Sequence, residues 1–149
     1  MRESGERKGA GRGSDPRPTS ERQALPPIVL IADDDATQRI VLQDALTRGG
    51  YLAIPVDDGG EIWPVLEREN VRALLLDLRM QGVNGWEVLR RLREDPALQE
   101  RRADLRVIVI SAQSDPASRD FVATLGADAF LAKPLDLDAV IAAVRNAPP

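Results

Sequence analysis

Residues 28–35, with the sequence Ile-Val-Leu-Ile-Ala-Asp-Asp-Asp, join a short apolar run to three consecutive aspartates. A continuous apolar run of this length is typical of a strand that is buried on both faces, as in parallel sheets. The next segment, residues 36–48, places four apolar residues on one face of a predicted helix: Val41, Leu42, Ala45 and Leu46. Two glycines then end the helical pattern. A buried strand followed by an amphipathic helix is the repeating unit of α/β proteins.

The same unit recurs along the chain. We predict further strands at 51–56, 73–76, 106–110 and 128–131, and further helices at 61–69, 85–93, 116–125 and 136–145. Strict alternation with right-handed crossovers predicts a doubly wound α/β fold, in which a five-stranded parallel sheet is covered by five helices. Pro55 cannot donate a hydrogen bond to a neighbouring strand, so we expect its strand at the sheet edge. The β-branched run at 106–110 predicts a central strand.

Three local expectations follow from the same patterns. Pro64 requires a place in the first turn of its helix, where amide hydrogens lack partners in any case. The segment Asp95–Leu105 is charged and longer than a helix-to-strand link needs, so we expect a solvated loop. Helix 116–125 is expected to pack on the sheet through three apolar residues: Phe121, Val122 and Leu125.

The composition indicates one domain preceded by a tail. The chain has 149 residues and is 43% hydrophobic, which suffices for one core. Residues 1–27 hold almost no large apolar side chain, so we predict a disordered tail there. The domain is then expected at 28–146, with 147–149 as a C-terminal end. No apolar run approaches the roughly 18 residues that span a bilayer, and no signal peptide is apparent, so we expect a cytoplasmic protein without membrane contact.

Charge and residue usage exclude several classes of function. The formal net charge is -4, which provides no electrostatic footprint for binding nucleic acid. The chain contains neither cysteine nor histidine. Disulfides, thiolate chemistry and internal phosphohistidine are therefore excluded, and any bound metal must be a hard cation with oxygen ligands.

Polar residues follow four of the predicted strands at their carboxyl ends. They are the aspartate run Asp33, Asp34 and Asp35, then Asp77, Ser111 and Lys133. Singly, each has an ordinary structural role, such as the helix N-cap that we expect of Asp35. In an open parallel sheet, however, these ends share one rim. Clustered carboxylates repel one another unless a cation neutralises them, and such oxygens suit Mg²⁺ with a phosphate ligand. One of the aspartates could then act as a nucleophile and form an aspartyl-phosphate.

With these motifs the chain resembles the receiver domain of two-component response regulators. The resemblance covers nearly all of residues 28–146. It is carried by four stretches in the expected order: Leu30–Asp35 with Arg39, Leu74–Met80 with Asn84-Gly85, Val109–Ala112, and Gly126–Pro134. It implies a flavodoxin-like fold and Mg²⁺-dependent transfer of a phosphoryl group from a partner's phosphohistidine.

The resemblance also implies individual roles. Asp77 would be the phosphoacceptor, and Ser111 and Lys133 would contact the phosphoryl group. Phe130 would be the aromatic residue that turns inward when Ser111 moves. The residues that would hold the metal are Asp33, Asp34, Asp77 and the backbone carbonyl of Arg79.

The chain departs from the family pattern near the acceptor. Gln81 stands where the family usually has proline, which suggests a less rigid loop. Two alternatives stay open: a pseudo-receiver that binds partners without phosphorylation, and an Mg²⁺-dependent phosphohydrolase with an aspartate nucleophile. The second alternative is weakened because Arg79 occupies the position where such enzymes carry their acid/base aspartate.

The expected partners follow from the same reasoning. Because the chain has no histidine, a histidine kinase or a histidine phosphotransfer protein must supply the phosphoryl group. An unknown downstream protein would receive the signal. The chain ends soon after the last predicted helix, so we expect a stand-alone regulator or a receiver separated from a larger protein. We predict a monomer or a weak phosphorylation-dependent dimer.

Overall fold

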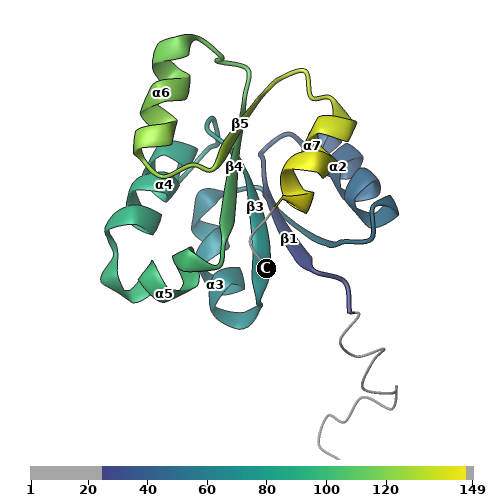
Figure 1. Ribbon diagram of the computed structural model, residues 1–149, viewed down its shortest axis with the longest axis horizontal. Coiled ribbons are helices and arrows are strands. Elements are labelled where there is room, and N and C mark those ends of the chain that lie inside the picture. The colour runs from purple at the N-terminus through teal and green to yellow at the C-terminus, as the bar shows by residue number, and fades with distance from the viewer. Residues whose placement is uncertain (1–24, 147–149) are drawn as a thin grey trace, which may run out of the picture.

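The computed structural model describes residues 25–146, and a single parallel sheet lies at its centre (Figure 1). The sheet has five strands in the order β2-β1-β3-β4-β5. Their bounds are β1 Ile28–Ala32, β2 Leu52–Val56, β3 Val71–Asp77, β4 Arg106–Ser111 and β5 Ala129–Ala132. This order is that of the flavodoxin-like doubly wound fold. The fold class predicted from the sequence is confirmed.

Helices cover both faces of the sheet. Figure 1 shows α2 (Ala36–Arg48) and α7 (Leu137–Arg145) on one side. On the other side lie α3 (Ile62–Arg68), α4 (Gly85–Glu94), α5 (Gln99–Ala103) and α6 (Pro116–Thr124). Two 3₁₀ turns, η2 (Gly59–Glu61) and η3 (Pro96–Leu98), precede α3 and α5. Within residues 25–146, no helix is long and apolar enough to cross a membrane.

The apolar side chains form two cores, one on each face of the sheet. Strand residues alternate between them: Leu30, Leu74 and Leu76 face the α3, α4 and α6 side, whereas Ile31, Leu75 and Ile108 face α2 and α7. The interior strands β1, β3 and β4 are therefore apolar on both faces, which explains their continuous apolar runs.

Two proline predictions are confirmed by the topology. Pro55 lies in β2, which pairs only with β1 and forms one edge of the sheet. Pro64 is the third residue of α3, within the first turn. The β-branched run in β4 lies between β3 and β5, in the interior of the sheet but not at its middle.

Two expectations about burial are wrong. Phe121 is 55% exposed, because α6 turns Val122 into the core and leaves Phe121 on the outside. Val41 is 39% exposed, since Leu42 and Leu46 alone carry the buried side of α2. In both helices the apolar face is wider than the area that contacts the sheet, so part of that face remains exposed.

The predicted loop at Asp95–Leu105 is also wrong, because this segment forms η3 and α5 and brings the number of α-helices within residues 25–146 to six. Polar caps rather than apolar periodicity hold the segment. Asp95 accepts a hydrogen bond from the Ala97 amide, and the Gln99 side chain donates to three carbonyls at the end of α4. Arg102 donates to the carbonyls of Leu105 and Gly126.

The predicted tail and C-terminal end fall mostly outside the described residues. Residues 1–24 and 147–149 lie beyond them, so the proposed disorder there stays a prediction. Residues 25–27 are described and carry no helix or strand.

Candidate functional site

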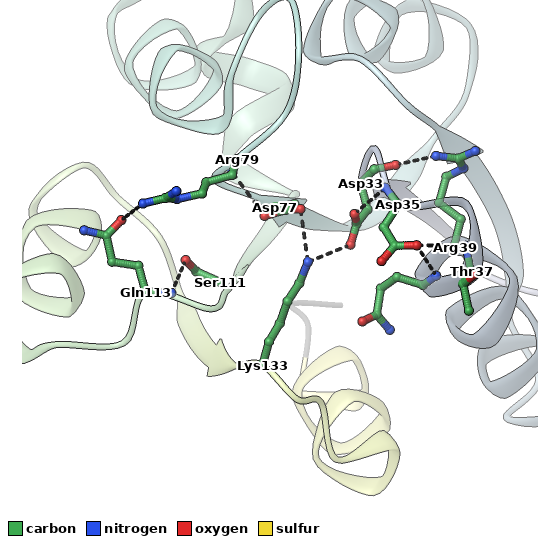
Figure 2. Close-up of polar contacts among 10 residues, drawn as sticks. Asp33, Asp35, Thr37, Arg39, Asp77, Arg79, Ser111, Gln113 and Lys133 are labelled. Carbon is green, nitrogen blue, oxygen red and sulfur yellow. Dashed lines mark hydrogen bonds and ion pairs between the residues drawn. The ribbon is translucent and has the colours of Figure 1, made fainter.

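Four neighbouring strands deliver the polar residues of the site to one rim. Asp33 follows β1, Asp77 ends β3, Ser111 ends β4 and Lys133 follows β5. The sheet order β1-β3-β4-β5 places these strand ends next to one another. Figure 2 shows the Lys133 side chain pointing between the carboxylates of Asp77 and Asp33. The convergence that we expected from the strand ends is present.

Lys133 joins two buried carboxylates. Its Nζ atom lies 3.1 Å from Asp77 Oδ2 and 3.3 Å from Asp33 Oδ2. Asp33 is fully buried and Asp77 is 4% exposed. Burial lowers the pKa of Lys133, but the two carboxylates outweigh this effect and raise it overall. Lys133 is therefore held as a cation against Asp77.

Asp77 is a carboxylate in an unfavourable environment for its charge. The pKa of Asp77 is raised from 3.8 to about 6, mainly because the carboxylate is buried and in smaller part because the Asp33 carboxylate lies nearby. The Arg79 amide, which donates to Asp77 Oδ1 at 3.1 Å, and Lys133 act in the opposite direction. One oxygen of Asp77 thus faces the Arg79 amide and the other faces Lys133.

The acidic cluster fits a divalent cation with oxygen ligands. Carboxylate oxygens of Asp33, Asp34 and Asp77 lie within 4.8 Å of one another. Asp33 Oδ2 is buried and accepts no hydrogen bond from residues 25–146, although Lys133 stands opposite as an ion-pair partner. One ammonium does not balance three carboxylates, and Asp34 is exposed, which leaves the cluster open to solvent. Such a set of hard oxygens suits Mg²⁺.

The two residues of the predicted switch lie on adjoining strands. Ser111 is fully buried, and its Oγ accepts a hydrogen bond from the Gln113 amide at 3.0 Å. No hydrogen bond joins Ser111 to Asp77 among the residues that the structure describes. Phe130 is half-buried on β5, and the Arg119 guanidinium lies 4.7 Å from its ring centroid.

The start of α4 is fitted closely against the end of β3. Asn84 caps the helix by accepting from the Glu87 amide, and Gly85 follows. A Cβ atom on Gly85 would lie 2.5 Å from the Asp77 carbonyl oxygen, which is closer than real contacts allow. Glycine is therefore required for the helix to begin directly beside Asp77.

Sequence reasoning missed an anchor of the loop after β3. Gly82 has a φ of +72°, which favours glycine. A Cβ atom at this position would also overlap the Asp58 carboxylate. The Gly59 amide also donates to the Val83 carbonyl at 3.1 Å. The loop thus packs against the turn after β2, although Gln81 replaces the usual proline. The glycines at 59, 60 and 82 were the available signal.

Two further contacts at the rim were not predicted. Arg39 Nη1 donates to the Asp33 carbonyl at 2.8 Å and so supports the aspartate run. Across the opposite side of the site, Arg79 Nη2 lies 3.4 Å from Gln113 Oε1 (Figure 2). Arg79 and Gln113 each lie two residues after the end of a strand, at Asp77 and Ser111 respectively.

Comparisons with known proteins agree with this geometry. Residues 29–145 match the family model of the response regulator receiver domain. The chain is 31% identical over 118 residues to a probable transcriptional regulator, ycf27, of Porphyridium aerugineum, covering 79% of this chain and 46% of that protein. It is 32% identical over 120 residues to the DNA-binding transcriptional regulator NtrC of Escherichia coli, covering 80% of this chain and 24% of NtrC.

A solved structure supports the same assignment. The response regulator receiver protein from Pseudomonas putida is 32% identical and superposes with a TM-score of 0.71, covering 80% of this chain and 96% of that one. The two curated relatives, in contrast, are more than twice as long as the stretch they share with this chain. The family model, the shared fold and the acidic rim agree, and the chain belongs to the response regulator receiver domain family.

Proposed function

We propose that this receiver domain accepts a phosphoryl group on Asp77 from a phosphohistidine of a partner protein and thereby switches its contacts with other proteins. The observation that carries the proposal is the arrangement of Asp77, which ends β3 at an open rim with Lys133 on one oxygen and two further carboxylates beside it. The donor would be a histidine kinase or a histidine phosphotransfer protein.

The transfer is a simple displacement at phosphorus. A carboxylate oxygen of Asp77 would attack the phosphorus atom of phosphohistidine as the phosphorus–nitrogen bond breaks. The bond's electron pair would leave with the imidazole, which takes up a proton where needed. Because negative charge in such a transition state is spread over the phosphoryl oxygens, positive groups positioned beside these oxygens provide most of the stabilisation.

Residues of the rim would supply that positioning. Asp33, Asp34, Asp77 and the Arg79 carbonyl would hold Mg²⁺, which supplies positive charge to the phosphoryl oxygens when bound. Lys133 would keep its place beside the Asp77 oxygen and contact the phosphoryl group as a second cation. Its 3.1 Å distance to Asp77 Oδ2 supports this role.

Ser111 and Phe130 would convert the phosphoryl group into a change of shape. The Ser111 oxygen accepts from the Gln113 amide, which leaves its hydroxyl hydrogen free to donate to a phosphoryl oxygen. Movement of Ser111 toward that oxygen would make room for Phe130 to turn inward. The phosphoryl group would therefore shift an existing equilibrium by contacts that only one arrangement offers.

The wider setting is part of the same proposal. We propose that the folded domain occupies residues 28–146, between the predicted tail at 1–27 and a short C-terminal end at 147–149. The protein would act in the cytoplasm as a monomer or a weak phosphorylation-dependent dimer. It would signal to a downstream protein.

The test is intact-protein mass spectrometry after incubation with Mg²⁺ and acetyl phosphate. We expect one adduct of about 80 Da, the mass of the transferred HPO₃ unit, that is absent in Asp77→Asn. If neither this adduct nor a response to beryllofluoride is seen, the domain is a pseudo-receiver. Continuous release of phosphate from small phosphoesters would instead indicate a phosphohydrolase.

A further inference from the structure

The surface between α4 and α6 carries a pair of aromatic side chains: Trp86, which packs partly against the core, and Phe121, which lies outside it. The rings of Trp86 and Phe121 stack with centroids 5.3 Å apart and an interplanar angle of 30°. Phe121 is 55% exposed and is the only phenylalanine or tryptophan among the large exposed apolar residues of the described chain. The stacked Trp86 ring covers one face of the Phe121 ring, and much of the other face is exposed to solvent.

The aromatic pair lines a shallow groove with a cation at its edge. Trp86, Arg90, Phe121 and Leu125 enclose about 130 Å³ between the two helices. Trp86 and Arg90 are one helical turn apart on α4, and Phe121 and Leu125 are one turn apart at α6. The groove therefore offers an apolar end and, about 6 Å along α4, a positive end.

The charge of Arg90 is not used within the described part of the chain. Its neighbour Arg91 stacks over Trp63 and pairs with Asp95, and Arg93 donates to the Thr124 carbonyl. Arg90 is exposed and has no ion pair or hydrogen bond among residues 25–146. Exposed aromatic rings beside an arginine are the side chains that most often dominate protein interfaces.

We propose that this groove binds an amphipathic helix of a partner protein, one that presents an apolar side chain and a carboxylate one turn apart. The apolar side chain would cover Phe121 and Trp86, and the carboxylate would pair with Arg90. Charge complementarity selects an acidic segment over a basic one, because Arg90 is the one charged residue lining the groove. The groove adjoins the phosphorylation rim at Trp86, but binding there does not need Asp77 to be phosphorylated.

Trp86 provides a local signal for occupancy. It borders both this groove and the cleft formed by Asp34, Arg79 and Asn84 at the rim. The chain contains two tryptophans, so the indole N–H signals in an ¹⁵N spectrum of the full chain can be assigned with Trp63→Phe. A helix seated on the groove must shift the Trp86 signal.

The experiment uses two synthetic helical peptides that differ only in charge. Both carry leucine at one position, with glutamate in one peptide and lysine in the other four residues later. We expect the glutamate peptide to shift the Trp86 signal and to bind at least about fivefold more tightly than the lysine peptide. Arg90→Glu should reverse this preference, and Phe121→Ala should weaken both peptides.

The controls separate this proposal from the phosphorylation chemistry. Arg68→Glu makes the same charge change at an exposed site on α3 and should leave the preference unchanged. Asp77→Asn should also bind the glutamate peptide normally. Equal binding of both peptides, or an unchanged preference in Arg90→Glu, would overturn the proposal, as would the absence of a Trp86 shift. A Trp86 signal that moves with protein concentration alone, and stops moving in Phe121→Ala, would assign the groove to a second copy of the chain instead.

Discussion

Replacement of Asp77 by asparagine is expected to stabilise the metal-free protein at neutral pH. Burial, followed by the charge of Asp33, raises the pKa of Asp77 from 3.8 to about 6 despite the Arg79 amide and Lys133. This shift of about two pKa units corresponds to a free energy of about 3 kcal/mol. Ionising Asp77 is less favourable by this amount in the folded chain than in the unfolded chain. Asparagine has the same shape and no charge, so it removes this cost.

The figure of about 3 kcal/mol already includes the attraction of Lys133, and the net gain is smaller only because an asparagine amide nitrogen cannot accept the hydrogen bond that Asp77 Oδ2 accepts from Lys133. Lys133 keeps Asp33 at 3.3 Å, so it is not left as an isolated buried cation. The lost hydrogen bond from this charged donor still costs free energy. We therefore expect Asp77→Asn to raise the free energy of unfolding by about 1–2 kcal/mol, or the melting temperature by about 4–8 °C.

The pH dependence gives the sign of this effect. Between pH 3.8 and about 6, folded Asp77 retains a proton that the unfolded chain has already released. The folded state binds more protons in this window, so its stability relative to the variant falls as pH rises. The advantage of Asp77→Asn should therefore be small near pH 4 and reach its full value above the folded pKa of about 6.

Urea unfolding in buffer with a metal chelator, at a series of pH values, measures the difference directly. Asp34→Asn is the matched control, because it removes a carboxylate charge from an exposed position and should change stability by less than about 0.5 kcal/mol. The reasoning is refuted if Asp77→Asn is less stable than the wild type at pH 7.5. It is equally refuted if the difference between the two proteins does not vary with pH.

Three further predictions concern the rim and its supports. Gly85→Ala should lower the free energy of unfolding by about 1–3 kcal/mol, because its methyl group would overlap the Asp77 carbonyl, and chemical denaturation measures the loss. The Lys133→Gln variant should still fold, but Asp77 would lack its neighbouring cation. Its phosphorylation by acetyl phosphate, followed by mass spectrometry, should be at least about tenfold slower, and an unchanged rate would contradict the role of Lys133. Arg102→Ala should lower the free energy of unfolding by about 1–2 kcal/mol, because Arg102 donates hydrogen bonds to two carbonyls that hold α5 in place. Amide hydrogen exchange in α5 should become faster, and unchanged exchange would show that other contacts hold this helix.

The sequence alone was sufficient for the fold class and for most of the site. Continuous apolar runs predict strands buried on both faces, and their alternation with helices predicts a parallel sheet. Carboxyl ends of such strands must share a rim, so Asp33, Asp77 and Lys133 could be expected together before any coordinates. Pro55 identified the edge strand, because a residue without an amide hydrogen is excluded from the interior of a sheet.

Local patterns were less reliable where polar groups rather than apolar periodicity determine the structure. The segment of η3 and α5 is held by the side chains of Asp95, Gln99 and Arg102, whose partners include a carbonyl far along the chain. The close fit of Gly82 against Asp58 likewise joins two loops. Such contacts depend on the distance between segments that are separate in sequence, which no periodic pattern encodes.

The apolar pattern determined which residues could enter the core, but the tertiary structure decided which of them did. Phe121 and Val122 are adjacent apolar residues on α6, and only the orientation of the helix on the sheet buries one and exposes the other. The raised pKa of Asp77 has the same origin, because it depends on how much water the folded chain removes and on the charges it brings near. Sequence specifies chemical groups and their local order, whereas burial and charge proximity exist only once the chain has packed.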